Sequence, residues 1–83
     1  MIPRIKNLKA EKDYKLYVVF DSGEKVIYDV SEDIKNIPEF SDLKTQRCLF
    51  NNVQLDESRT CVFWNDRIDL PSDTLLEYGT KID

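Results

Sequence analysis

Histidine is absent from this chain of 83 residues, and glycine occurs only twice. Without histidine the sequence lacks the usual general base of a catalytic Ser/His or Cys/His pair and the imidazole ligand of a mixed zinc site. With only Gly23 and Gly79 it cannot form a glycine-rich phosphate-binding loop. These absences exclude the common enzyme signatures. We therefore expect a non-catalytic protein that uses no cofactor and binds no metal.

Cysteine is also scarce, and long apolar runs are missing. Cys48 and Cys61 fit no zinc or redox spacing, and we expect both to be free thiols buried within strands. No apolar run approaches the roughly 18 residues of a membrane span, and the N-terminal residues lack the apolar centre of a signal peptide. We expect a cytoplasmic protein with no membrane contact.

The charge balance is acidic, with 16 acidic against 12 basic residues and a net charge of −4. Residues 1–83 suffice for a single domain with one small core. An acidic balance disfavours nucleic acid and favours a basic partner. A nucleic-acid-associated regulator is the alternative, and it would use the densest basic strip, Lys6, Lys9, Lys12 and Lys15. The same lysines are also explained as solvated strand residues that protect the edge of a sheet.

The stretch Tyr14–Val30 predicts a β-hairpin. Runs of β-branched and aromatic residues flank Asp21-Ser22-Gly23, which suits a three-residue loop with Gly23 in the left-handed conformation. A preceding alternation over Ile5–Ala10 predicts a first strand, so we expect a three-stranded meander. The turn fixes the register of the hairpin, which pairs Lys15 with Asp29, Leu16 with Tyr28, Tyr17 with Ile27 and Val18 with Val26.

Two helical segments are expected, one near 31–44 and one at 71–78. Ser31 begins the first as its cap, and Pro38 interrupts it. Its apolar residues recur every three positions at Ile34, Ile37, Phe40 and Leu43. Ser72 provides a start signal for the second helix and Gly79 a stop, and its apolar side would consist of Leu75, Leu76 and Tyr78.

A second strand pair is predicted between Leu49 and Trp64. Asp56-Glu57-Ser58-Arg59 reads as its turn, and Asn65-Asp66-Arg67 turns the chain again. We expect Leu55 to face Thr60, Val53 to face Val62 and Asn51 to face Trp64. The fold class is therefore α+β, an antiparallel β-meander plus a second strand pair with short helices.

Several motifs also occur in an order that resembles one known family. They are Pro3-Arg4-Ile5, Tyr14-x-Leu16, Phe20-Asp21-x-Gly23-Glu24, Tyr28-Asp29-Val30, Phe50-x-x-Val53 and Trp64-Asn65-x-x-Ile68-Asp69-Leu70-x-x-Asp73-x-Leu75-x-Glu77-x-Gly79. Together they resemble the small bacterial family called domain of unknown function 2442, over nearly the whole chain. The chain departs from the commoner pattern after Trp64, where members often carry glycine and Asp66-Arg67 stands here.

The resemblance implies an α+β fold and brings no established catalytic residues. Some members of that family look fused to a helix-turn-helix domain, and some occur beside toxin-like small genes. With four residues after Gly79, we expect no DNA-reading domain in this chain. The resemblance instead implies a toxin-like or regulatory protein as the partner.

An enzymatic or small-molecule site would use the turn after the second strand pair. Trp64, Asp66, Arg67 and Asp69 would form its rim. Asp66, Asp69 and Asp73 would also be the candidate acid–base group, although aspartate is common in turns and at helix starts for capping alone.

The favoured site is an apolar face of the first hairpin. The face with Leu16 and Val18 is the stronger and should take the core. A chain this small has too few elements to cover the other face as well. The exposed face, Tyr17, Val19 and Ile27, has an apolar centre and a charged rim, as interfaces do. We expect a protein-interaction module that binds a protein partner or itself through this face.

Overall fold

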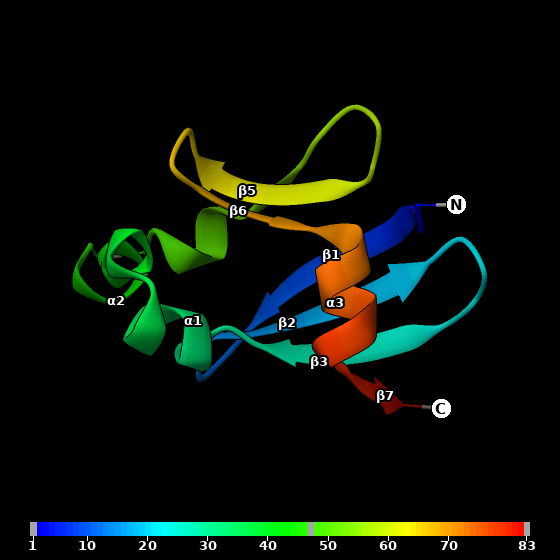
Figure 1. The fold of residues 1–83 in the computed structure, drawn as a ribbon, viewed down its shortest axis with the longest axis horizontal. Coiled ribbons are helices and arrows are strands. Elements are labelled where there is room, and N and C mark those ends of the chain that lie inside the picture. Colours follow the sequence, from blue (N-terminus) through cyan, green and yellow to red (C-terminus); the bar gives the residue numbers. More distant parts are fainter. Residues whose placement is uncertain (1, 47, 83) are drawn as a thin grey trace.

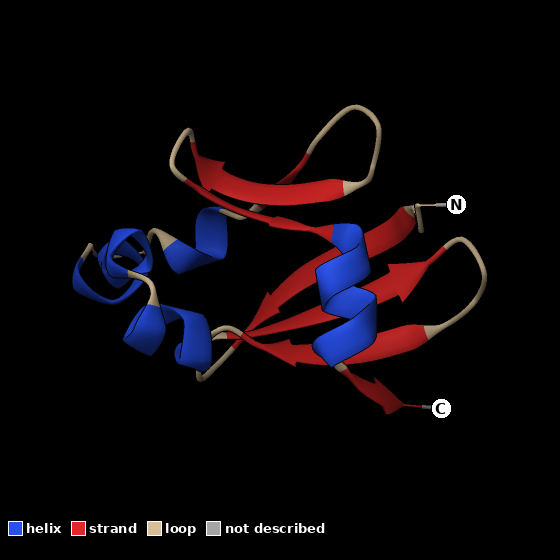
Figure 2. Ribbon diagram, viewed as in Figure 1, coloured by secondary structure: helices blue, strands red, loops and turns tan. Residues whose placement is uncertain are grey.

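The computed structural model describes residues 2–46 and 48–82, which form two antiparallel sheets with short helices (Figure 2). One sheet has the order β1–β2–β3–β7 and the other β4–β5–β6. The α+β prediction is confirmed. The elements in chain order are β1 (Ile5–Glu11), β2 (Lys15–Phe20), β3 (Lys25–Asp29), α1 (Ser31–Asn36), η1 (Pro38–Ser41), α2 (Asp42–Thr45), η2 (Phe50–Asn52), β4 (Gln54–Leu55), β5 (Cys61–Asn65), β6 (Ile68–Pro71), α3 (Ser72–Tyr78) and β7 (Thr80–Ile82).

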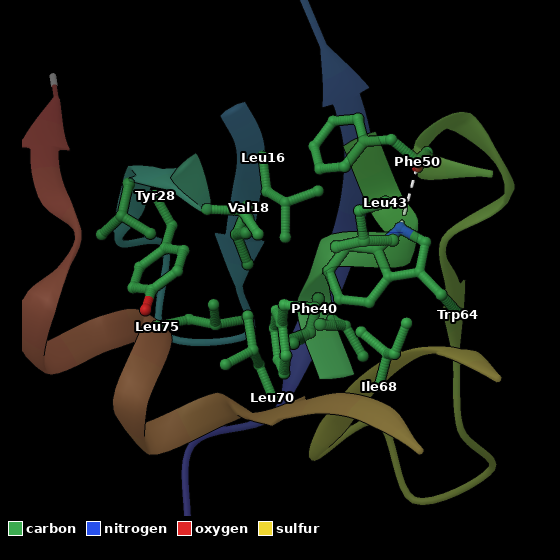
Figure 3. Packing of buried hydrophobic residues seen from close by; sticks show 14 of the residues in the cluster. Leu16, Val18, Tyr28, Phe40, Leu43, Phe50, Trp64, Ile68, Leu70 and Leu75 are labelled. Atoms are coloured by element: carbon green, nitrogen blue, oxygen red, sulfur yellow. Dashed lines mark hydrogen bonds between the residues drawn. The ribbon is translucent and has the colours of Figure 1, made fainter. Parts of the chain in front are cut away.

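The core lies between the two sheets. Figure 1 shows β5 and β6 above the larger sheet, α3 in front of its strands, and α1 and α2 gathered at one end. All these elements send side chains into one buried cluster (Figure 3). Its members with no exposed surface are Ile5, Leu16, Val18, Val26, Val30, Val62 and Leu75.

The first hairpin has the predicted register. Lys15 pairs with Asp29, Tyr17 with Ile27 and Val18 with Val26. Gly23 has a φ of 95° and donates its amide to the carbonyl of Phe20, as the three-residue turn requires. Since side chains alternate across a strand, this register sends Leu16 and Val18 into the core and leaves Tyr17 and Val19 on the other side.

The second hairpin differs from its prediction by two residues. Leu55 faces Val62, not Thr60, and Gln54 faces Phe63. The Asp56 carboxylate accepts hydrogen bonds from the amides of Thr60 and Cys61 at 3.1 and 3.2 Å, which holds a longer turn than the predicted one.

Within the predicted strand Leu49–Leu55, residues Phe50–Asn52 form the 3₁₀ helix η2, and only Gln54–Leu55 is a strand. The conformation of η2 is explained by an aromatic cluster. Phe50 stacks on Trp64 with ring centroids 5.8 Å apart, and its carbonyl accepts the indole N–H of Trp64 at 2.9 Å (Figure 3). Tyr14 and Phe40 meet the same pair edge-on.

The helical segment near 31–44 divides at Pro38, as predicted. Phe40 and Leu43 are buried, and Ile34 and Ile37 pack against the core. Ser31 does not cap α1; its amide and hydroxyl both donate to the Asp29 carboxylate, at 3.0 and 2.5 Å. The Asp29 carboxylate, two residues before Ser31, is the local acceptor in place of the serine hydroxyl.

The C-terminal region contains elements that were not expected. β6 adds a third strand to the smaller sheet, and β7 pairs with β3 at the edge of the larger one. Ser72 begins α3, but its hydroxyl donates to the carbonyl of Pro3 at 2.6 Å and is not a cap. Tyr78 was assigned to the apolar side of this helix, yet 72% of it is exposed.

Gly79 follows α3 at a position where no side chain fits. Its φ is −73°, so the left-handed conformation is not the reason for a glycine here. A Cβ at this position would lie 2.5 Å from the carbonyl oxygen of Leu75 and 3.0 Å from the Cβ of Val26. The glycine therefore lets the end of α3 approach β3 closely, and β7 follows directly from it.

The two hairpin turns are joined by an ion pair. Arg59 donates to both carboxylate oxygens of Asp21, at 2.8 and 2.9 Å, and to the carbonyl of Ile5 at 3.1 Å. The hydrogen bond from Arg59 holds the pKa of Asp21 below its ordinary value of 3.8. The Ile5 amide in turn donates to the Arg59 carbonyl at 2.7 Å. This contact, called here the hairpin clasp, fixes both turns to the start of β1.

We predict that Gly79→Ala lowers the free energy of unfolding by about 1–3 kcal/mol, because the added methyl group overlaps backbone and core atoms. Urea unfolding followed by circular dichroism measures the change. Glu77→Ala, at an exposed position of the same helix, is the control and should change little. Unaltered stability of Gly79→Ala would contradict the close approach.

We predict that the hairpin clasp weakens in acid. Because the pKa of Asp21 is lower in the folded state, its contribution is present above the unfolded value and is lost as pH falls through the folded one. The melting temperature of Asp21→Asn should therefore lie below wild type at pH 6, and the gap should close as the pH falls below the ordinary aspartate value of 3.8 and Asp21 becomes protonated in the folded state. At pH 6, Arg59→Gln should cost less in the Asp21→Asn background than in wild type, because only the hydrogen bond to the Ile5 carbonyl is then left to lose. A gap that persists in acid would show that the ion pair is not its cause.

Candidate functional site

The strands of the larger sheet leave one side uncovered by the packed core. Tyr17 and Ile27 face each other across β2 and β3, and Val19 faces Lys25. Lys25 in turn faces Ile82 of β7, which is 37% exposed. We call the side formed by Tyr17, Val19, Ile27 and Ile82 the outer face.

The apolar side chains of the outer face are contiguous. Tyr17, Val19 and Ile27 are all partly buried, because neighbouring strands shield their flanks while their tips point away from the core. In Figure 1 the elements that fill the core, α3, β5 and β6, stand on the opposite side of these strands. Adjacent apolar tips with no core partner are the usual composition of a binding surface.

Charged residues surround the outer face. Pairing places Lys9 opposite Tyr17, and places Glu11 and Asp29 on either side of Lys15. Lys9 and Glu11 form an ion pair at 3.7 Å. The rim therefore carries both positive and negative charges, whereas the chain as a whole is acidic.

The predicted lysine strip does not lie on one surface. Lys9 and Lys15 occupy the outer face, Lys12 is in the turn between β1 and β2, and Lys6 sits at a register irregularity of β1. Only two of the four lysines therefore flank the apolar centre.

The turn after β5 has mostly exposed residues around a buried tryptophan. Trp64 is 5% exposed and its indole N–H is bonded to Phe50. Asp66, Arg67 and Asp69 are exposed. The Asn65 side-chain oxygen accepts from the amides of Arg67 and Ile68, which shapes the turn. A shallow hollow of about 260 Å³ lies beside Arg67 and is otherwise lined by Pro38, Glu39 and Asp42.

Asp73, the third predicted carboxylate, is at the start of α3. It accepts the amide of Thr74 at 2.8 Å. The carboxylates whose pKa is lowered lie elsewhere: Asp21 beside Arg59, Asp29 beside Ser31, and Asp56 beside Ser58. Each is lowered first by a side-chain hydrogen bond. In all three cases the hydrogen bond belongs to a turn or to the hairpin clasp.

The cysteines are free, as predicted, but they are not both buried. Cys48 is exposed and has a φ of 66°, so it lies in a turn and not in a strand. Cys61 begins β5 and is partly buried; burial raises the pKa of its thiol, and Asp69 and Asp56 raise it further. The apolar neighbours in sequence did not reveal that the chain turns at Cys48.

A largely apolar hollow was not apparent from sequence. It has a volume of about 880 Å³ and lies where the hairpin clasp, the N-terminal segment and α3 meet. Ile2, Pro3, Phe20 and Leu76 supply its apolar lining, and Arg4 and Glu24 lie at its polar part. Residues distant in sequence come together there, so no local pattern indicated it.

The family model described as "Protein of unknown function (DUF2442)" matches residues 5–81. The chain belongs to the DUF2442 family. A comparison with curated proteins and one with solved structures each found no match. Among the described residues of this DUF2442 chain, no helix is long and apolar enough to cross a membrane, and no group of three or more metal-ligating side chains occurs.

We predict unequal reactivity of the two thiols. At pH 8 a disulfide reagent such as Ellman's reagent should modify Cys48 at least about tenfold faster than Cys61, because Cys61 is shielded and its thiol is harder to ionise. Cys48→Ser and Cys61→Ser assign the two rates, and both should become equal in denaturant. Equal rates in the folded protein would contradict the placement of Cys48 and Cys61.

Proposed function

We propose that this DUF2442 chain is a non-catalytic, cytoplasmic protein-interaction module that binds a partner through the outer face. The observation that carries the proposal is the register of β2 and β3, which aligns Tyr17 with Ile27 on the side away from the core. A partner that covers these tips removes apolar surface from water, which stabilises the complex.

The composition of the outer face supports binding of protein. Its centre contains a tyrosine and three aliphatic side chains, and aromatic residues are enriched in the centres of interfaces. The tyrosine contributes a large apolar ring and a hydroxyl that can donate a hydrogen bond at the edge of a contact. The surrounding lysines and acids supply the polar rim.

The partner class follows from charge and from the family likeness. A chain with a net charge of −4 attracts a basic protein at long range and so favours its encounter. The resemblance points to a toxin-like or regulatory protein. A basic protein of that class is therefore the foreign partner that we propose.

The chemistry of the side chains supports a role without catalysis. A thiol whose pKa is raised, as that of Cys61 is, is a poor nucleophile at neutral pH. The aspartates whose pKa is lowered accept hydrogen bonds within turns or the hairpin clasp, and Trp64 belongs to the core. These groups are occupied in maintaining the fold.

The test uses Tyr17→Lys combined with Ile27→Glu. Immobilised wild type and variant are each exposed to lysate of the native host, and captured proteins are compared by mass spectrometry. We expect the variant to remain folded and to lose partners that wild type retains, because charge then occupies the centre of the outer face. Tyr78→Lys, at a site on α3 that is 72% exposed, is the matched control and should retain them.

Two outcomes contradict the proposal. If the variant unfolds under conditions in which Tyr78→Lys is stable, the outer face belongs to the core. If the variant folds and captures the same partners as wild type, the binding surface lies elsewhere, and the hollow beside Ile2 and Leu76 becomes the next surface to alter.

A further inference from the structure

The outward side chains of β3 form a self-complementary series. Lys25, Ile27 and Asp29 alternate with core residues along this strand, so they lie in line on the outer face. A two-fold rotation about the middle residue exchanges the two ends. It therefore brings each lysine to the aspartate of a second copy.

We propose that a second copy of this chain covers the outer face, about a two-fold axis that crosses the strands at the Tyr17–Ile27 pair. In this arrangement Ile27 lies over its equivalent, and Lys25 of each copy meets Asp29 of the other. The inference rests on the proposed function, since it takes the outer face as the binding surface and names one occupant.

The charge of the outer face fits a second copy. Lys9, Lys15 and Lys25 oppose Glu11 and Asp29 on this face, which gives three positive charges against two negative and a sum of +1. The whole chain carries −4. The outer face thus lacks the acidic excess that would make two copies repel each other on close approach.

Lys25 and Asp29 are both available for an ion pair between two copies. Asp29 uses Oδ1 to accept from the amide and hydroxyl of Ser31, which orients the carboxylate and lowers its pKa, so it is ionised at neutral pH. Lys25 is exposed and forms no ion pair with any described residue. A partner aspartate would give it one.

The same rotation has two unfavourable contacts. It brings the two Lys9 side chains together at the β1 edge, where each already pairs with Glu11 of its own chain at 3.7 Å and solvent screens the charges. It also sets Lys15 of each copy over Val19 of the other, because Lys15 faces Asp29 and Val19 faces Lys25. The dimer therefore depends on the two contacts between Lys25 and Asp29 and on the apolar contact at Ile27.

The size of the outer face sets the strength of the dimer. Strands about 4.8 Å apart with residues about 3.3 Å apart give β1, β2, β3 and β7 a footprint of roughly 15 by 17 Å. This is well below the ~800 Å² per partner of a standard interface. We therefore expect a reversible dimer with a dissociation constant in the micromolar range or weaker.

Exchanging the charges at Lys25 and Asp29 of β3 tests the proposed position of the two-fold axis. Sedimentation velocity is run at roughly 1–500 µM, a range suited to a weak dimer. Lys25→Asp alone and Asp29→Lys alone should each weaken association at least about tenfold, since both place like charges in contact. An equimolar mixture of the two single variants should associate again, because every contact then has opposite charges. The double variant Lys25→Asp, Asp29→Lys should also recover. Lys44→Asp, an equal change of charge on α2, is the control.

Each result separates this inference from the proposed function. Wild type that stays monomeric throughout the range overturns the dimer, while the lysate comparison still decides whether the outer face binds another protein. The position of the two-fold axis is wrong if wild type dimerises but the single variants associate with unchanged affinity. It is also wrong if the mixture of the two single variants does not regain the affinity of wild type. Thermal melts of every variant verify folding, because Asp29→Lys removes the hydrogen bonds from Ser31. Lys25→Asp leaves those hydrogen bonds in place.

Discussion

The pairing of β2 with β3 determines which side of the larger sheet is core and which is surface. A shift of one residue would send Tyr17 and Ile27 inward and expose Leu16 and Val26. The three-residue turn at Gly23 and the opposite charges of Lys15 and Asp29 both favour the observed pairing. The docking of α3, the aromatic cluster and the outer face all depend on this alternation.

The second sheet is attached to the first by contacts of different kinds. At one end Tyr14, directly before β2, meets Phe50 edge-on, and Phe50 in turn stacks on Trp64 of β5. The hairpin clasp holds the other, where Arg59 bridges Asp21 and Ile5. Ser72 adds a buried bond to the carbonyl of Pro3. A small core gains from such links, since its apolar burial alone leaves little surplus stability.

Local chemistry made some of this predictable. The turn at Gly23 and the break at Pro38 each follow from the residue that occupies the position, and both are found as expected. The family likeness was also readable from the motifs, above all from the string between Trp64 and Gly79, and the match to residues 5–81 confirms it.

Tertiary contacts decided the rest. The two-residue error in the second hairpin arose because Asp56 accepts two backbone amides and lengthens the turn, which its composition alone did not specify. β7 is only three residues long, and it follows Gly79, whose missing side chain lets the end of α3 approach β3. Cys48 has apolar neighbours yet lies in an exposed turn. The alternation on the outer face was predicted, whereas Ile82, its fourth apolar residue, entered only through β7.

The outer face is the surface on which two copies of this chain are proposed to associate. A dilution series of ¹⁵N–¹H correlation spectra measures this association most directly, because each amide reports its own surroundings. We expect concentration-dependent shifts confined to the outer face, at the amides of Lys9, Tyr17, Val19, Lys25, Ile27, Asp29 and Ile82. Shifts concentrated at Ile2, Arg4 and Leu76, with the outer face unchanged, would contradict it.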